Sequence, residues 1–172
     1  MSNVKLISIK NREWSHWYSN LVCNAIVKAS GSPWIHSQLL VENTMYESTF
    51  PDGFRKKENY VFEQNDLNMI QGFKEDFTER ELGAVIAWWE DRIKRGTKYG
   101  VLKLFVYMIL RKTRKFWDLI HYTPMHNDEI WGDFCSAAVI NSVLFAGRVM
   151  LPGADPEYAT PGELIESKEL LL

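Results

Sequence analysis

The sequence predicts an α+β fold, because strand patterns fill the first third of the chain and helical patterns fill most of the rest. Its 172 residues suit a single domain, residues 1–172, which would bury roughly two-thirds of its unfolded surface. A composition that is 46% hydrophobic and 13% aromatic excludes intrinsic disorder and collagen-like repeats.

The opening segment predicts one strand and one helix. Val4 to Ile9 alternate apolar and polar residues, as a half-buried strand does. A helix is expected over Asn20 to Ala29, with Ser19 as its cap. The run Ser30-Gly31-Ser32-Pro33 would end it.

A hairpin follows. Trp34 to Val41 and Met45 to Thr49 read as two strands around a tight polar turn near Glu42-Asn43. Pro51-Asp52-Gly53 has the residue types of a further turn. A third strand is predicted over Tyr60 to Glu63.

The middle of the chain predicts a capped amphipathic helix. Thr78-Glu79-Arg80-Glu81 fits the capping box, in which the threonine and the glutamate satisfy each other's backbone amides. Gly96 suits the end of this helix. Its apolar face comprises Leu82, Val85, Ile86, Trp89 and Ile93.

The last third predicts one more long helix. An apolar segment, Tyr99 to Leu110, leads into a basic stretch. The helix is expected over Phe134 to Ala146, capped by Asp133 in front and by Gly147 behind. The proline-containing tail from Leu151 is expected to be mostly loop.

Charge and cysteine content narrow the function classes. A net charge of -2 gives no overall field that would attract nucleic acid or an anionic membrane. Two cysteines form no disulfide framework and suit a reducing compartment. The longest apolar run, Leu104 to Leu110, is far shorter than the ~20 residues that span a bilayer. With no secretory signal in Met1 to Lys10, we expect a cytoplasmic protein without membrane insertion.

Cys135 is the candidate nucleophile. It lies in the first turn of the predicted helix, where unpaired amides and the helix dipole favour thiolate over thiol. The competing interpretation is a buried core cysteine, since cysteine is among the most frequently buried residues.

His36 is the candidate base among four histidines. It lies on a predicted strand directly after a turn, between Ile35 and a run of further apolar residues, where a polar ring needs partners. His16 lies among aromatic residues, and His121 and His126 lie in the polar stretch before Cys135.

Glu47 is the candidate orienting group, and its reach depends on strand register. With residues 40–43 as the loop, His36 and Glu47 face each other directly. With Glu42-Asn43 as the loop, Glu47 faces Gln38 and lies diagonal to His36, which then faces Thr49. With residues 43–44 as the loop, they lie about 13 Å apart. Thr49 and Gln38 are therefore the alternatives to Glu47.

Six segments, in order along about three-quarters of the chain, resemble the circularly permuted NlpC-like cysteine hydrolases. These are papain-fold proteins of the YiiX and YaeF type, more distantly related to the lecithin:retinol acyltransferase group. The segments are Ser32 to Leu40, Met45 to Thr49, Asp52 to Arg55, Gly96 to Gly100, Phe134 to Val139 and Ala159 to Leu164.

The resemblance implies a permuted papain-like fold with a small antiparallel sheet packed on helices. It also implies a cysteine hydrolase that cleaves an amide or ester bond of a peptide or acyl substrate without a cofactor. Cys135 would be the nucleophile, His36 the base and Glu47 the orienting group, and Tyr99 would line the substrate pocket. Ile35, Ala137 and Gly100 depart from the family pattern.

Three other functions compete with this hypothesis. The fold could serve as an inactive binding or accessory protein, for instance a viral one, and seven tryptophans suit interaction surfaces. Basic clusters at residues 92–98 and 111–115 could bind nucleic acid or lipid headgroups, but such clusters are usually solvated helix ends. His121, His126 and the nearby acidic residues lack zinc spacing, so no metal site is predicted.

Overall fold

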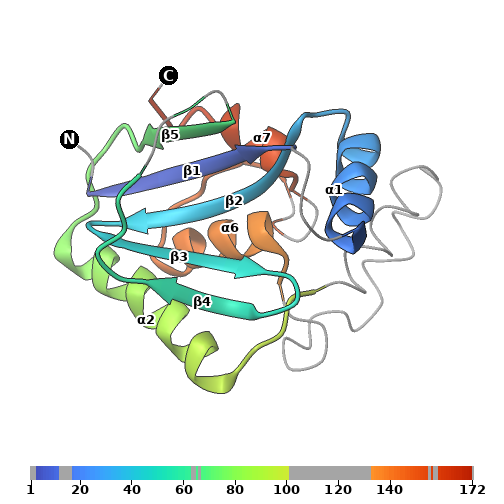
Figure 1. The fold of residues 1–172 in the computed structure, drawn as a ribbon. Helices are drawn as coiled ribbons and strands as arrows, with labels where there is room; N and C mark the ends of the chain where they lie inside the picture. The colour runs from blue at the N-terminus through green and yellow to red at the C-terminus, as the bar shows by residue number, and fades with distance from the viewer. Residues whose placement is uncertain are drawn as a thin grey trace.

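The computed structural model describes residues 3–11, 17–62, 65, 67–100, 133–154, 156 and 159–171. In this part of the chain it is an α+β structure, a sheet accompanied by four helices (Figure 1). The strands are β1 (Val4–Lys10), β2 (Trp34–Val41), β3 (Thr44–Thr49), β4 (Gly53–Lys57) and β5 (Asn68–Gly72). The helices are α1 (Trp17–Ser30), α2 (Glu79–Arg95), α6 (Cys135–Phe145) and α7 (Pro161–Ile165).

All neighbouring strands of the sheet are antiparallel, in the order β4-β3-β2-β1-β5. Strands β2, β3 and β4 form consecutive hairpins, and β5 returns to the free edge of β1. Leu40 pairs with Met45 and Val41 with Thr44, so Glu42-Asn43 is the turn between β2 and β3. This register later decides which side chains meet in the site.

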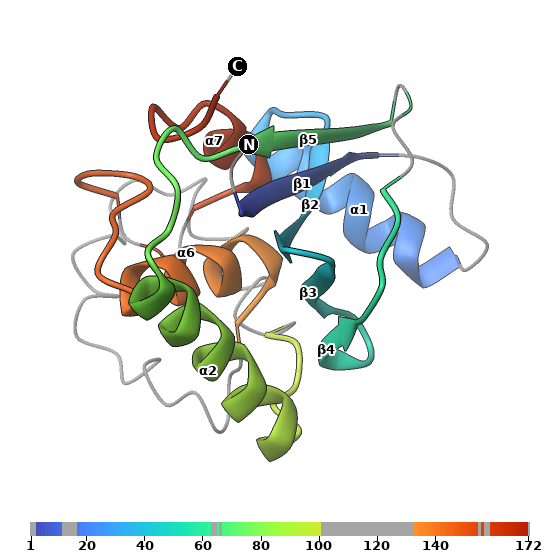
Figure 2. The ribbon, with the colours of Figure 1, turned by 90° about the vertical axis from the view of Figure 1, so that its left-hand side faces the viewer.

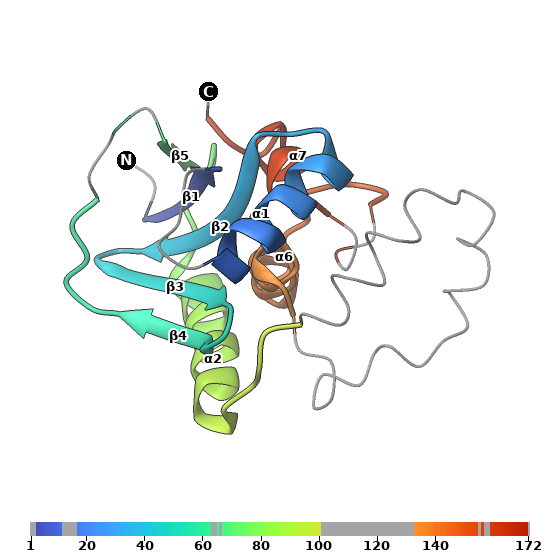
Figure 3. The same cartoon turned by 45° about the vertical axis from the view of Figure 1, so that its right-hand side comes forward.

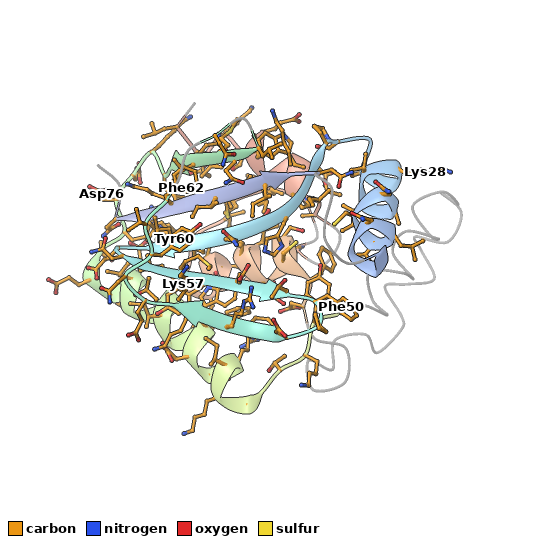
Figure 4. The ribbon with its side chains drawn as sticks, viewed as in Figure 1. Lys28, Phe50, Lys57, Tyr60, Phe62 and Asp76 are labelled. Carbon is orange, nitrogen blue, oxygen red and sulfur yellow. The ribbon has the colours of Figure 1, made fainter. Side chains whose placement is uncertain are left out.

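The main core lies between the sheet and two helices on the same side of it (Figure 2). Trp89 of α2 and Val139 of α6 are fully buried there against Leu39 of β2. On the opposite face, Tyr60 and Phe62 lie across the strands in Figure 4 and pack on a second, smaller cluster. That cluster is built on Ile7, Leu40 and Met45.

Helix α1 lies at one end of the sheet, beside the start of α6 (Figure 3). Its Ile26 packs with Ile35 at the beginning of β2 and with Phe134 and Ala137 around the N-terminus of α6. A third apolar cluster therefore surrounds the segment that carries Cys135.

The capped helix of the middle region is confirmed. Thr78 is the N-cap of α2, and both hydrogen bonds of the capping box with Glu81 are present. Gly96 ends the helix in the left-handed conformation with φ 65°, which glycine adopts without steric cost. The strand at Val4, the β2–β3 hairpin and the turn at Pro51-Asp52-Gly53 are confirmed as well.

The strand predicted over Tyr60 to Glu63 is wrong. Tyr60 to Phe62 form no strand, and β4 and β5 lie on either side of them. Strand β4 was not predicted because it is an edge strand with the polar residues Arg55, Lys56 and Lys57 exposed. Its pairing with β3 comes from the tight turn and not from apolar alternation.

Helix α6 begins at Cys135, and its predicted cap, Asp133, is wrong. The N-cap is Phe134, which makes no side-chain capping bond. Asp133 lies one residue earlier, and its carboxylate accepts a hydrogen bond from Asn141 Nδ2 at 3.4 Å. Gly147 follows the helix with φ 89°, as expected for a residue at its end.

Two further boundaries differ from the prediction. Helix α1 begins at Trp17, so Ser19 lies inside it and does not cap it. The tail contains the short helix α7, whose capping box joins Thr160 and Glu163. Pro161 occupies the first turn of this helix, where the missing N–H costs nothing, so this proline starts the helix instead of breaking it.

Several predicted features lie outside the described residues. They are His16, the segment after Gly100, the basic cluster at 111–115, and His121 and His126. Among the helices that are described, none is both long and apolar enough to cross a membrane.

Candidate active site

His36 and Glu47 form a partly buried ion pair. The His36 Nε2 atom lies 2.8 Å from Glu47 Oε2, and the Glu47 side chain is 4% exposed. This contact follows from the register, because Leu39 pairs with Tyr46 and the same register places Gln38 opposite Glu47. Glu47 is thus diagonal to His36, as predicted for a Glu42-Asn43 turn, and it is the residue that contacts the ring.

Glu47 accepts three hydrogen bonds from neighbouring side chains. Besides His36, Gln38 Nε2 donates to Oε2 at 2.7 Å and Arg55 Nε donates to Oε1 at 2.7 Å. A buried carboxylate needs such partners because its hydration is lost. Gln38 is therefore a second donor to Glu47, and Thr49 lines the adjacent cavity.

Arg55 also belongs to the site, although no pattern in the sequence indicated a role for it. Its position in β4 is directly opposite Glu47, so the two are a cross-strand pair. Arg55 NH1 also donates to Asp52 in the preceding turn at 2.7 Å. The signal that could have revealed this residue is the short Pro51-to-Gly53 turn, which returns the chain beside Glu47.

These contacts keep Glu47 ionised. Burial raises the pKa of its carboxyl, but the hydrogen bond and charge of His36, together with Arg55 and Gln38, outweigh burial and lower it to about 2. An ionised Glu47 accepts a hydrogen bond from His36 Nε2–H and fixes which ring nitrogen remains for other contacts. That nitrogen is Nδ1.

Cys135 is the first residue of α6, and its side chain lies against the start of β2. Its sulfur is 3.9 Å from the carbonyl oxygen of Ile35 and 4.0 Å from the Tyr99 hydroxyl. The residue is 2% exposed. At this position the dipole and the unpaired amides of a helix N-terminus stabilise a thiolate.

The Cys135 thiol and the His36 ring shift each other's ionisation. Burial raises the pKa of the thiol, but the charge and hydrogen bond of His36 outweigh it, so the pKa of Cys135 falls below its ordinary value. For His36, burial acts in the other direction and lowers the pKa of the ring. Cys135 and Glu47 outweigh burial and raise this pKa to about 10. The arrangement therefore favours a thiolate–imidazolium pair.

Tyr99 contacts the site from the segment after α2. Burial and the nearby Cys135 thiolate raise the pKa of its hydroxyl, which therefore stays protonated as a donor. Gly53 helps to place this segment, because a Cβ there would collide with the Thr97 carbonyl oxygen, and Phe54 N–H donates to that same oxygen at 3.2 Å.

Hydrogen bonds hold the N-terminus of α6 against its surroundings. Ser48 Oγ of β3 donates to the carbonyl oxygen of Asp133 at 2.7 Å, and both residues are buried. Ser136 Oγ donates to the carbonyl oxygen of Ala159 at 2.6 Å. The strand that carries Glu47 is thereby linked to the residue two positions before the nucleophile.

A cavity of about 240 Å³ opens beside these residues. His36, Glu47 and Tyr99 line it, together with apolar residues of α1. Cys135 is not part of the lining, but its sulfur contacts two residues that are, Ile35 and Tyr99. A ligand in the cavity would therefore lie next to the thiol.

The described part of the chain gives little support to a metal site or to a site for nucleic acid. There, no group of three His, Cys, Asp or Glu side chains is arranged to hold a metal ion. At the basic end of α2, Arg95 pairs with Asp91 at 3.0 Å and Arg92 stacks on the Trp88 ring at 3.7 Å. Both contacts are typical of a helix end.

Comparison with known proteins gives no relative. No protein-family model, curated protein or solved structure matches this chain.

Proposed function

We propose that this protein is a cysteine hydrolase that cleaves an amide or ester bond through a thioester on Cys135, in a permuted papain-like fold. The observation that carries the proposal is the partly buried His36–Glu47 pair at 2.8 Å, whose ring interacts with the Cys135 thiol at a helix N-terminus. The chain order, with the histidine strand before the cysteine helix, supports the permuted arrangement.

In the first half-reaction, the Cys135 thiolate attacks the carbonyl carbon and a C–S bond forms while the carbonyl electron pair moves to oxygen. The His36 imidazolium then donates its Nδ1 proton to the leaving nitrogen or oxygen as the bond to the carbonyl carbon breaks. Glu47 keeps the ring in the tautomer and orientation that this transfer requires.

In the second half-reaction, neutral His36 takes a proton from a water molecule that attacks the thioester carbon. The C–S bond breaks, the acid product leaves, and the thiolate–imidazolium pair is restored. No cofactor takes part in this proposed cycle.

The developing oxyanion would lie at the N-terminus of α6. The backbone N–H of Cys135 is one donor placed there, and the protonated Tyr99 hydroxyl, 4.0 Å from the sulfur, is the second.

One observation favours the second candidate, a binding or accessory protein without turnover. Cys135 is 2% exposed, and its sulfur does not line the cavity. A core cysteine of this kind would be inert.

Thiol reactivity separates the two candidates. The rate of Cys135 alkylation by iodoacetamide should be measured between pH 4 and pH 9 by peptide mass spectrometry, with Cys23 as the internal control. We expect reactivity well below pH ~8.5, the pKa of a free thiol, because the thiolate is already formed.

His36→Ala should lower the alkylation rate of Cys135 at pH 6 on the order of 100-fold, because the thiolate fraction then follows an ordinary thiol. Turnover of a panel of esters and amides should be lost with it. Equal rates for Cys135 and Cys23, unchanged by the substitution, would reject the hydrolase in favour of the binding protein.

A further inference from the structure

The cavity beside Cys135 has a polar half and an apolar half. The polar half is formed by His36, Gln38, Glu47, Thr49 and Arg55. The apolar half includes Val22 and Ile26 of α1, with Ile35, Phe50 and Tyr99. A ligand that fills the cavity must therefore offer a polar group at one end and apolar surface at the other.

The charges of the polar half are already paired within the protein. Arg55 Nε donates to Glu47 and Arg55 NH1 donates to Asp52, both at 2.7 Å. Glu47 is in turn bonded by His36 and Gln38. A charged substituent on the ligand would thus lose its hydration without gaining a counter-ion among these groups.

The apolar half is continuous with buried packing around the nucleophile. Val22 and Ile26 belong to the cluster that contains Ile35, Phe134 and Ala137, three residues at the start of β2 and around the start of α6. Phe134, directly before the nucleophile, therefore packs in one cluster with aliphatic side chains of α1. Water is weakly held there, so an apolar ligand group gains free energy by displacing it.

Phe50 forms the rim of this half. It is 40% exposed, and its ring centroid is 6.4 Å from that of Tyr99. Figure 4 shows Phe50 at the end of β3, on the side of the sheet toward α1. An exposed aromatic ring at the mouth of a cavity adds apolar surface that a ligand can cover.

We infer that the substrate carries an uncharged, apolar substituent next to its scissile carbonyl, and that this substituent lies against Val22, Ile26 and Phe50. The inference rests on the proposed function for the carbonyl but on the cavity for the substituent. With about 240 Å³ available, the pocket selects a substituent of limited length.

Alkylating probes test the cavity directly. N-methyl, N-butyl and N-hexyl iodoacetamide should alkylate Cys135 at rates that rise roughly fourfold for each added methylene, because each methylene is transferred from water to the apolar half of the cavity. A probe of hexyl length that ends in a carboxylate should lose this gain. Rates are expressed relative to a small free thiol, which removes differences in intrinsic reactivity.

Two neighbouring residues of α1 provide a matched pair of variants. Val22 lines the cavity, whereas Leu21 is 58% exposed and outside the lining. Val22→Asn should bring the hexyl-to-methyl rate ratio close to one, and Leu21→Asn should keep the wild-type ratio. Thermal unfolding of both variants confirms that each ratio is measured on folded protein.

The outcomes separate this inference from the proposed function. Fast iodoacetamide alkylation at low pH with no dependence on chain length would overturn the apolar substituent and leave the hydrolase intact. Slow alkylation that still rises with chain length and falls in Val22→Asn would keep the apolar ligand and reject the hydrolase. A carboxylate-ended probe that reacts as fast as the hexyl probe would also overturn the inference.

Discussion

Glu47 and Glu81 each accept a hydrogen bond from an arginine Nε at nearly the same distance, but their surroundings differ. Arg55 Nε donates to Glu47 at 2.7 Å, and Arg148 Nε donates to Glu81 at 2.8 Å. The Glu47 side chain is 4% exposed and that of Glu81 is 24% exposed. The pKa of each carboxyl is nevertheless lowered to about 2.

The causes of these two low pKa values differ. For Glu81, the main causes are hydrogen bonds from Arg148 and from the backbone and hydroxyl of Thr78 at the start of α2. For Glu47, burial works in the opposite direction and is outweighed first by His36. Neither Arg148 nor Thr78 can take up or release a proton for a neighbouring nucleophile, whereas His36 is a titratable ring, with a pKa raised to about 10, that also interacts with Cys135. A low carboxyl pKa thus marks pairing, and the titratable partner marks the candidate site.

Replacing each glutamate by glutamine is the strongest test of the difference between Glu47 and Glu81. Glu47→Gln should slow Cys135 alkylation at pH 6 on the order of tenfold, because the His36 imidazolium loses its carboxylate. It should also cost roughly 3–5 kcal/mol of unfolding free energy, since Arg55 and His36 lose a buried counter-charge.

Glu81→Gln is the matched control for that experiment. It removes a similar arginine pair and one half of the capping box, so it should lower stability without changing the rate of Cys135 alkylation. The measurements are urea unfolding and alkylation on the same samples. An equal loss of thiol reactivity in the two variants would show that Glu47 acts through general stability and not through His36.

The contribution of Glu47 to the free energy of unfolding should be lost at acidic pH. Its folded pKa of about 2 lies below the ordinary 4.5, so between these values the unfolded state binds more protons. The stabilisation is therefore complete above pH 4.5 and lost as the pH falls toward 2. Urea unfolding of wild type and Glu47→Gln should show their free-energy difference shrinking across this range, and a constant difference would contradict the assignment.

The His36–Cys135 pair behaves differently with pH. Below the ordinary thiol pKa of 9.0, the unfolded pair keeps a proton on the thiol, whereas in the folded pair the raised pKa of His36 keeps one on the imidazolium. Above 9.0 only the folded state holds the proton, so stability should fall as the pH rises through about 10, the folded pKa of His36.

The predictions from the sequence were correct for elements that are determined by residues close together in the chain. The capping box at Thr78, the Gly96 terminus and the β2–β3 hairpin each depend on residues close together in the chain. The position of Cys135 at a helix N-terminus was predicted for the same reason, although the helix starts after Phe134 and Asp133 does not cap it.

The partners of Glu47 could not be deduced with the same certainty. Register alone decides whether Glu47, Thr49 or Gln38 orients His36, and a shift of one residue would have moved Glu47 to the other face. Arg55 reaches Glu47 only because β4 pairs with β3, and the sequence of β4 lacks the apolar alternation that would have predicted a strand. Likewise, the apolar wall of α1 depends on tertiary packing around Phe134.

Gly83 offers the smallest test of the difference between the two glutamate regions. It lies within α2, two residues after Glu81, and a Cβ at this position meets no atom within 4 Å. Gly83→Ala should therefore stabilise the protein by roughly 0.5–1 kcal/mol, the helix preference of alanine over glycine. Because the Glu81 region is structural, the alkylation rate of Cys135 should stay at the wild-type value while the urea midpoint rises. A changed alkylation rate would mean that α2 transmits its stability to the thiol, and the two regions would then be coupled.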